Sequence, residues 1–150
     1  MTQSLLFWIA ISFIPGVFGG RFKPGAWYES LPRPPWTPPN LAFPIVWTFL
    51  YAAMGTAAWL VFRGGVGEHR RLVVLFLIQL VLNGLWSWIF FGRQQIALAL
   101  IDLIALWVAV AVLTAMFWKV SPLAGGLMAV YLAWLSIAIS LNGYIYAHMR

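Results

Sequence analysis

Residues 27–51 read WYESLPRPPWTPPNLAFPIVWTFLY, and this stretch holds six of the nine prolines and three of the ten tryptophans of the chain. Proline fixes φ and lacks a backbone donor, and the residue before a proline is disfavoured in helical geometry. The segment from Pro32 to Pro39 is therefore predicted to be a stiff, non-helical strap. Trp27, Tyr28 and Trp36 are then free to lie over an apolar surface.

The chain as a whole has the composition of a membrane protein. Hydrophobic residues make up 63% of the sequence and charged residues 8%, with a mean hydropathy of +0.91. Soluble domains average about 25% charged residues. A helix needs about 20 apolar residues to cross a hydrocarbon core that is ~30 Å thick, so 150 residues allow about five or six spans. We expect one compact transmembrane domain over residues 1–150.

Five apolar blocks lie between charged or Pro/Gly-rich segments. They are Leu5 to Gly20, Pro44 to Phe62, Leu72 to Phe91, Ile96 to Trp118 and Leu123 to Ala147. This pattern predicts an all-α bundle of five transmembrane helices with a Pro/Trp-rich first loop and with its ends on opposite sides. The first block follows no basic residue and precedes no A-x-A-like site, so we expect a retained helix rather than a signal peptide.

The distribution of basic residues gives a weak orientation. The side with the first loop and the C-terminus carries five of them, and the other side carries four. The positive-inside rule then places the first loop and the C-terminus in the cytoplasm. The net charge of +6 indicates contact with anionic lipid headgroups. No loop is long enough to form a nucleic-acid-binding domain.

Several kinds of chemistry lack the residues that they need. The chain has no cysteine, which excludes disulfides, thiolate metal sites and cysteine nucleophiles. Its two histidines, His69 and His148, lie in a loop and near the C-terminus, and we expect interfacial residues there, with axial haem ligation as the open alternative. Walker, G-x-S-x-G and H-E-x-x-H motifs are absent. We therefore expect neither a bound metal nor a required cofactor.

Three of the apolar blocks place aromatic and neutral polar residues on one helical face. In the second block these are Trp47, Tyr51, Met54 and Ala58. In the third block they are Gln79, Asn83, Trp86 and Phe90, and in the fifth they are Tyr131, Trp134, Ala138 and Leu141, with Asn142 beside them. Each face alone is equally typical of helix packing. Together they indicate a site for a large, flat, apolar molecule with a few polar groups.

Asp102 is the only acid well inside an apolar block. At 1.5 Å per residue it lies roughly 10 Å below the start of its helix. An unpaired charge is costly at that depth, so we expect Asp102 to be protonated, hydrogen-bonded to another helix or paired with water. A proton relay would need a partner acid or histidine, which the sequence does not supply.

The motif W-Y-x-x-L-x-[KR]-P-x-W-x-P-P, followed by F-P-x-V-W-x-x-L-Y-x-x-M-G, resembles the translocator protein family, also called tryptophan-rich sensory proteins (TspO/MBR). The resemblance continues through QLVLNGLWSWIFFG, RQQIALALIDL, VSPLAGG and YLAWLSIAISLN, so it covers nearly the whole chain. One departure is Val130, where the family usually has proline. A kink before Tyr131 is therefore expected to be weak or absent.

The resemblance implies an integral membrane receptor or transporter that binds porphyrins or haem-type tetrapyrroles, sterols and synthetic aromatic ligands under a lid formed by the first loop. The implied ligand-binding residues are Tyr28, Trp47, Tyr51, Asn83, Trp86, Phe90, Trp134, Ala138 and Leu141. The implied lid residues are Trp27, Pro34, Trp36 and Pro38. A sterol motif is loosely matched by Leu141, Tyr144 and Arg150.

Two further functions remain open. The first is an enzyme that degrades porphyrin with light or oxygen, with Trp47 and Trp134 as the redox-active residues beside the bound ring. The second is assembly as a homodimer, for which Gly16-x-x-x-Gly20 offers a small-residue contact. Because that motif lies at the end of a block, it favours packing within the molecule over a dimer contact.

Overall fold

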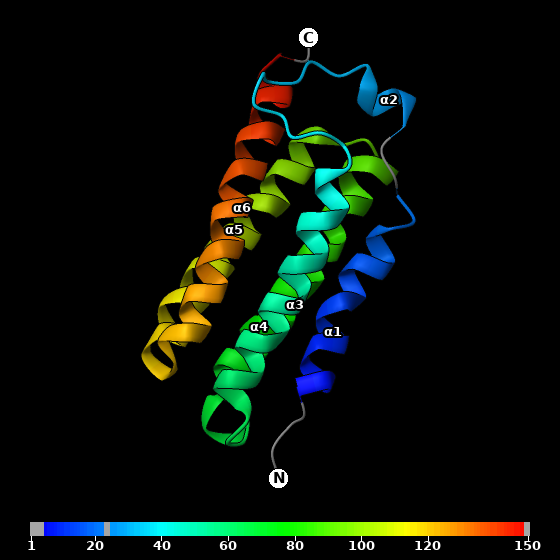
Figure 1. Cartoon of the computed structure of the whole chain (residues 1–150). Helices are drawn as coiled ribbons and strands as arrows, with labels where there is room; N and C mark the ends of the chain where they lie inside the picture. Colours follow the sequence, from blue (N-terminus) through cyan, green and yellow to red (C-terminus); the bar gives the residue numbers. More distant parts are fainter. Residues whose placement is uncertain (1–4, 23–24, 149–150) are drawn as a thin grey trace.

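The computed structural model describes residues 5–22 and 25–148, and all regular structure in these ranges is helical (Figure 1). The α-helices are α1 (Leu5–Gly19), α2 (Ala26–Glu29), α3 (Ala42–Phe62), α4 (Arg70–Ser87), α5 (Ile96–Val120) and α6 (Pro122–His148). A 3₁₀-helix over Gly67–His69 precedes α4, and a π-helix over Trp88–Gly92 follows it.

Each predicted apolar block coincides with one long helix of the structure. The helices α3, α5 and α6, and α4 with its flanking 3₁₀ and π segments, are long and apolar enough to cross a membrane, and α1 is a shorter apolar helix of 15 residues. In lipid every backbone group needs an internal partner, which favours uninterrupted helices. The single turn of α2 was not predicted, but the strap from Pro32 to Pro39 is non-helical, as predicted.

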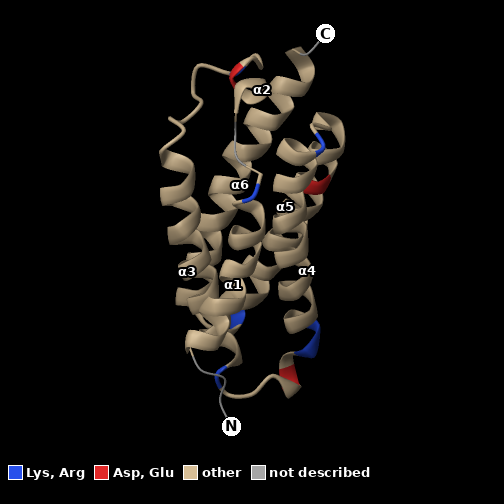
Figure 2. Ribbon diagram, turned by 90° about the vertical axis from the view of Figure 1, so that its right-hand side faces the viewer, with Lys and Arg blue, Asp and Glu red and all other residues tan. Residues whose placement is uncertain are grey.

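The long helices alternate in direction along the bundle (Figure 1). The first loop, the α4–α5 connection and the end of α6 lie at one end, whereas the start of α1 and the other two connections lie at the opposite end. Basic and acidic residues gather toward these two ends along the ribbon, with Asp102 inside α5 as the exception (Figure 2). This relative placement is the one that the sequence predicts, although the predicted charge count includes Lys23 and Arg150, which lie outside the described residues.

Small residues allow α1 to approach the bundle closely. A Cβ on Gly55 of α3 would lie 2.6 Å from Cα of Ile9, so only glycine fits this crossing. A Cβ on Gly16 would lie 2.6 Å from a ring carbon of Tyr51. Gly16 therefore serves packing within the molecule, which is the alternative that its position at the end of a block suggested.

The third apolar block does not remain α-helical to Phe91. From Trp88 the backbone adopts π geometry, and Arg93 N donates to the carbonyl of Trp88, five residues earlier, at 2.8 Å. The expected α-helical spacing from Gln79 to Phe90 is therefore wrong beyond Ser87. Residues spaced by a π turn are offset from an α-helical face, as is common where helices carry function.

Candidate functional site

A chain of hydrogen bonds crosses the centre of the bundle and joins α3, α4 and α6. The Tyr51 hydroxyl donates to Oδ1 of Asn83, and Nδ2 of Asn83 donates to the Tyr131 hydroxyl, each at 2.8 Å. The Tyr131 hydroxyl in turn donates to Oε1 of Gln79 at 2.8 Å, and Nε2 of Gln79 lies 3.7 Å from Sδ of Met54. Gln79 and Asn83 of α4 therefore contact side chains of α3 and α6.

Two tryptophans lie beside this polar chain, on α3 and α6. Trp47 stacks on Tyr51 with 5.5 Å between ring centroids, and it meets Trp134 edge to face at 6.4 Å. The rings of Phe43 and Trp134 also meet edge to face, with 5.8 Å between their centroids. Trp47, Trp134 and Ala138 are only half-buried. The buried indole N–H of Trp134 has no hydrogen-bond partner among the described residues.

A second aromatic group lies toward the first loop and centres on Phe90. Trp86 stacks on Phe90 at 5.0 Å and donates its indole N–H to Oδ1 of Asn142 at 3.0 Å. Trp27 and Tyr28 of α2 both pack edge-on against Phe90. Burial raises the pKa of the Tyr28 phenol above its ordinary value, and the Arg33 guanidinium partly offsets this rise.

The strap is attached to α6 by its tryptophan. Nε1 of Trp36 donates to Oγ of Ser140 at 3.0 Å, and the Trp36 ring meets the edge of Tyr144 at 5.7 Å. Trp36 nevertheless remains 54% exposed. Within the strap, Oγ1 of Thr37 donates to the carbonyl of Pro34 at 2.7 Å, which fixes a turn.

The structure thus divides the predicted ligand-binding residues into two neighbouring groups. One group contains Trp47, Tyr51, Asn83, Trp134 and Ala138, and the other contains Tyr28, Trp86 and Phe90. Leu141 is buried one position before Asn142, the partner of Trp86. Of the predicted lid residues, Trp27 faces Phe90, whereas Pro34 and Pro38 line the inside of the first loop.

The remaining sequence-based candidates lie outside these groups. Tyr144 of the sterol motif contacts Trp36 and stacks on His148, and Arg150 lies outside the described residues. Asp102 is buried, and its Oδ2 has no hydrogen-bond partner among the described residues. Of the three states expected for this carboxyl group, a hydrogen bond from Oδ2 to another helix is therefore not formed within the described part of the chain. The described residues contain no group of three His, Cys, Asp or Glu side chains that could hold a metal ion.

Three contributions to the site were not predicted from the sequence. Tyr131 was placed on the inner face, but its role as donor and acceptor between Asn83 and Gln79 depends on a helix distant in sequence. Phe43 lies four residues before Trp47 in α3, but it precedes the apolar block that was predicted to begin at Pro44. Ser140 holds the strap through a contact between residues 104 positions apart, which no local pattern can reveal.

The sequence matches the TspO/MBR family over residues 5–147. It is 42% identical to the translocator protein of Homo sapiens over 130 residues, which cover 83% of this chain and 77% of that protein. It is 41% identical to the tryptophan-rich protein TspO of Chlorobaculum tepidum over 139 residues, covering 89% and 88% of the two chains.

A third similar protein is CrtK of Rhodobacter capsulatus, which is 39% identical over 131 residues, or 85% of this chain and 81% of that protein. The family match over residues 5–147 extends through all the long helices and the strap. Together with the four apolar helices that are long enough to cross a bilayer, these matches identify an integral, multi-pass membrane protein. The chain belongs to the TspO/MBR family.

Proposed function

We propose that this protein is a membrane receptor or transporter that binds a flat, lipophilic tetrapyrrole between α3, α4 and α6. One observation supports this most directly: Trp47 and Trp134 are half-buried beside a polar chain in which Tyr51, Asn83 and Tyr131 satisfy one another. Aromatic walls with a few fixed polar groups are typical of sites for large, flat ligands.

The polar chain gives this site its rigidity. Because the Tyr131 hydroxyl both accepts and donates a hydrogen bond, it ties α6 to two positions of α4. Tyr51 ties α3 to the same amide, and Trp47 stacks on Tyr51. Rings held in this way lose little freedom when a ligand stacks on them, which favours affinity. The free indole N–H of Trp134 offers one donor to an acceptor on the ligand.

The strap next to the site can act as a lid, and the helices around the site can span a bilayer. The strap lies over the end of the bundle with Trp36 bonded to Ser140, so a ligand would exchange when that contact opens. We infer that α1 also crosses the membrane and completes five spans, with the first loop and the C-terminus in the cytoplasm. Anionic lipids would contact the charged ends, and we expect a homodimer.

Ligand titration with matched tryptophan variants tests the assignment. Trp47→Ala and Trp134→Ala should each weaken tetrapyrrole binding by roughly tenfold to a hundredfold, because loss of a stacking aromatic costs about 1–3 kcal/mol. Trp118→Ala is the control, since Trp118 is exposed on α5 near the opposite end. Equal losses in all three variants would contradict the site.

The same samples separate binding from catalysis. The edge-to-face contact of Trp47 and Trp134 places two oxidisable rings together, which is the observation that favours porphyrin degradation as the second candidate function. A bound spectrum that is stable in light and air supports the receptor. Bleaching that requires protein together with light or oxygen, and that is lost in both tryptophan variants, supports the enzyme. Competition by a sterol would widen the ligand class.

A further inference from the structure

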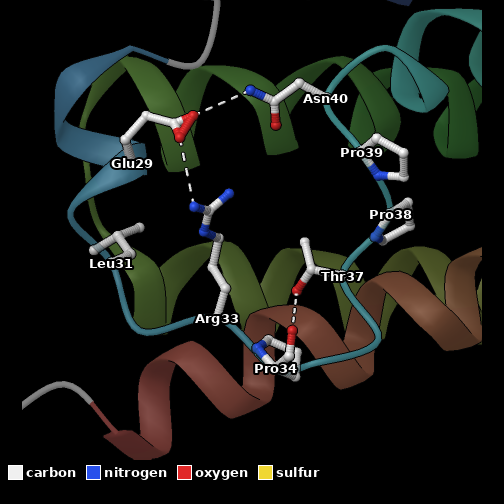
Figure 3. A pocket seen from close by; sticks show the side chains of 8 residues that line it. All are labelled: Glu29, Leu31, Arg33, Pro34, Thr37, Pro38, Pro39 and Asn40. Carbon is white, nitrogen blue, oxygen red and sulfur yellow. Dashed lines mark hydrogen bonds and ion pairs between the residues drawn. The ribbon is translucent and has the colours of Figure 1, made fainter.

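The first loop folds into a ring around a polar hollow. The hollow has a volume of about 470 Å³ and is lined by Glu29, Leu31, Arg33, Pro34, Thr37, Pro38, Pro39 and Asn40 (Figure 3). The ring closes where Oε1 of Glu29 accepts a hydrogen bond from Nδ2 of Asn40 at 3.1 Å. The side chain of Arg33 extends across the inside of the ring toward Glu29 (Figure 3).

Arg33 is the cation of this hollow, and its ion pair is loose. Its Nη2 lies 3.5 Å from Oε2 of Glu29, in a pair whose side chains are 29% and 51% exposed. Exposed pairs of this kind add little stability. A guanidinium prefers two parallel bonds to one carboxylate and has five donors, so most of its capacity is unused by this contact.

Arg33 also connects the hollow to the aromatic part of the site. Its guanidinium carbon lies 5.0 Å from the centre of the Tyr28 ring. Tyr28 packs on Phe90, and Phe90 stacks on Trp86. A flat ligand that extends from the Trp47–Trp134 site toward these rings would therefore bring its edge near the Arg33 guanidinium.

We propose that the hollow is an anion subsite in which Arg33 pairs with a carboxylate of the bound ligand and displaces Glu29. This inference rests on the proposed function and specifies its substrate class: flat amphiphiles with an acidic edge. Without ligand, Arg33 is paired with Glu29. A neutral ligand cannot replace this ion pair, so it obtains no affinity from Arg33. The Glu29–Asn40 bond uses the other carboxylate oxygen, so the ring can stay closed during the exchange.

The test compares a dicarboxylic porphyrin with its uncharged dimethyl ester, using purified full-length protein in phosphatidylcholine nanodiscs. The parent protein should bind the acid about tenfold more tightly than the ester, because a charge-assisted pair forms only with the acid. Arg33→Gln should abolish this preference, so that acid and ester bind with equal affinity. Glu29→Gln should tighten binding of the acid alone, because it removes the internal competitor.

Arg93→Gln is the matched control, since Arg93 lies at the same end of the bundle, 5.5 Å from the Trp88 ring and outside the hollow. It should keep the preference. Equal affinity of acid and ester in the parent overturns the subsite, as does an equal loss of preference in Arg33→Gln and Arg93→Gln. Failure of both ligands to bind would instead refute the proposed function.

A lipid phosphate carries the same chemistry as a ligand carboxylate, so the titrations are repeated in phosphatidylglycerol nanodiscs. A preserved preference for the acid supports the ligand as the occupant of Arg33. A preference that disappears in these nanodiscs shows that headgroup phosphates occupy Arg33, and it overturns the assignment to the ligand.

Discussion

The side-chain amide of Asn83 accepts a hydrogen bond from one tyrosine and donates one to another, so a single residue joins three helices. Buried polar groups stabilise a fold only when their partners are complete, since an unpaired group retains its desolvation cost. Asn83 therefore determines both the rigidity of the centre and the position of the rings beside it. Asn83 is the acceptor for the Tyr51 hydroxyl and the donor to the Tyr131 hydroxyl.

Replacing Asn83 by leucine should lower stability by about 2 kcal/mol, because the Tyr51 and Tyr131 hydroxyls both lose a partner. A thermal melt in detergent measures this loss as a reduced Tm. The double variant Asn83→Leu with Tyr51→Phe should regain part of it, because one orphaned hydroxyl is removed. A melt of Asn83→Leu equal to that of the parent would show that the chain of hydrogen bonds contributes no stability.

Ala138→Thr tests the wall of the site next to Trp134. Threonine adds two heavy atoms and can bond to the carbonyl four residues earlier, which bends a helix. Overpacking costs about 1–3 kcal/mol, and we expect it to appear as weaker binding of rigid, flat ligands with a preserved melt. Ala133→Thr on the exposed face of α6 is the control. A lowered melt with unchanged affinity would make Ala138 a packing residue only.

At the scale of the elements, the strap and the π-helix place the second aromatic group. The strap meets α6 through Trp36, and the π-helix carries Phe90 against the residues of α2. Neither contact is local in sequence. The loop and the end of α4 therefore form one unit that covers the bundle from above in Figure 1.

Trp36→Phe should speed ligand release by roughly twofold to tenfold, because it removes a hydrogen bond worth about 0.5–1.5 kcal/mol but keeps an aromatic ring against Tyr144. Stopped-flow displacement measures the rate. Ser140→Ala should give the same increase, and the double variant should add nothing further. If release rates match the parent in both single variants, this contact does not hold the lid.

The elements differ in how far the sequence predicts them. The long helices follow from apolar length alone, and the strap follows from its prolines. The turn of α2 and the π geometry after Ser87 depend on tertiary packing around Phe90, which periodicity does not encode. For the same reason the sequence predicts Gln79 and Asn83 as inward-facing but does not predict Tyr131 as their shared partner.

At the scale of the whole molecule, charged residues lie toward the two ends (Figure 2). Large apolar side chains are exposed along the helices between them. Exposed Leu, Ile and Val residues along α4 and α5 would be unfavourable in water and suit contact with lipid. Asp102 is the exception within α5, and its burial away from this surface agrees with the cost of a carboxyl group in lipid.

The orientation can be tested with single cysteines, because the chain contains none. Ser30→Cys lies in the first loop and Glu68→Cys in the α3–α4 connection, at opposite ends of the bundle. In intact cells, a membrane-impermeant maleimide should label only Glu68→Cys if the first loop is cytoplasmic. Labelling of Ser30→Cys alone would reverse the orientation, and both should react in opened membranes.

The turn between α5 and α6 has a consequence for the way the protein enters its membrane. Ser121 alone separates a helix of 25 residues from one of 27, and Pro122 starts the second helix. A Cβ on Gly125 would lie 2.7 Å from Trp118, so the two helices meet immediately after the turn. A connection of one residue is far too short to span a hydrocarbon core that is ~30 Å thick, so the end of α5 and the start of α6 stay at the same side of the membrane. We therefore expect α5 and α6 to enter the membrane together, as one helical hairpin.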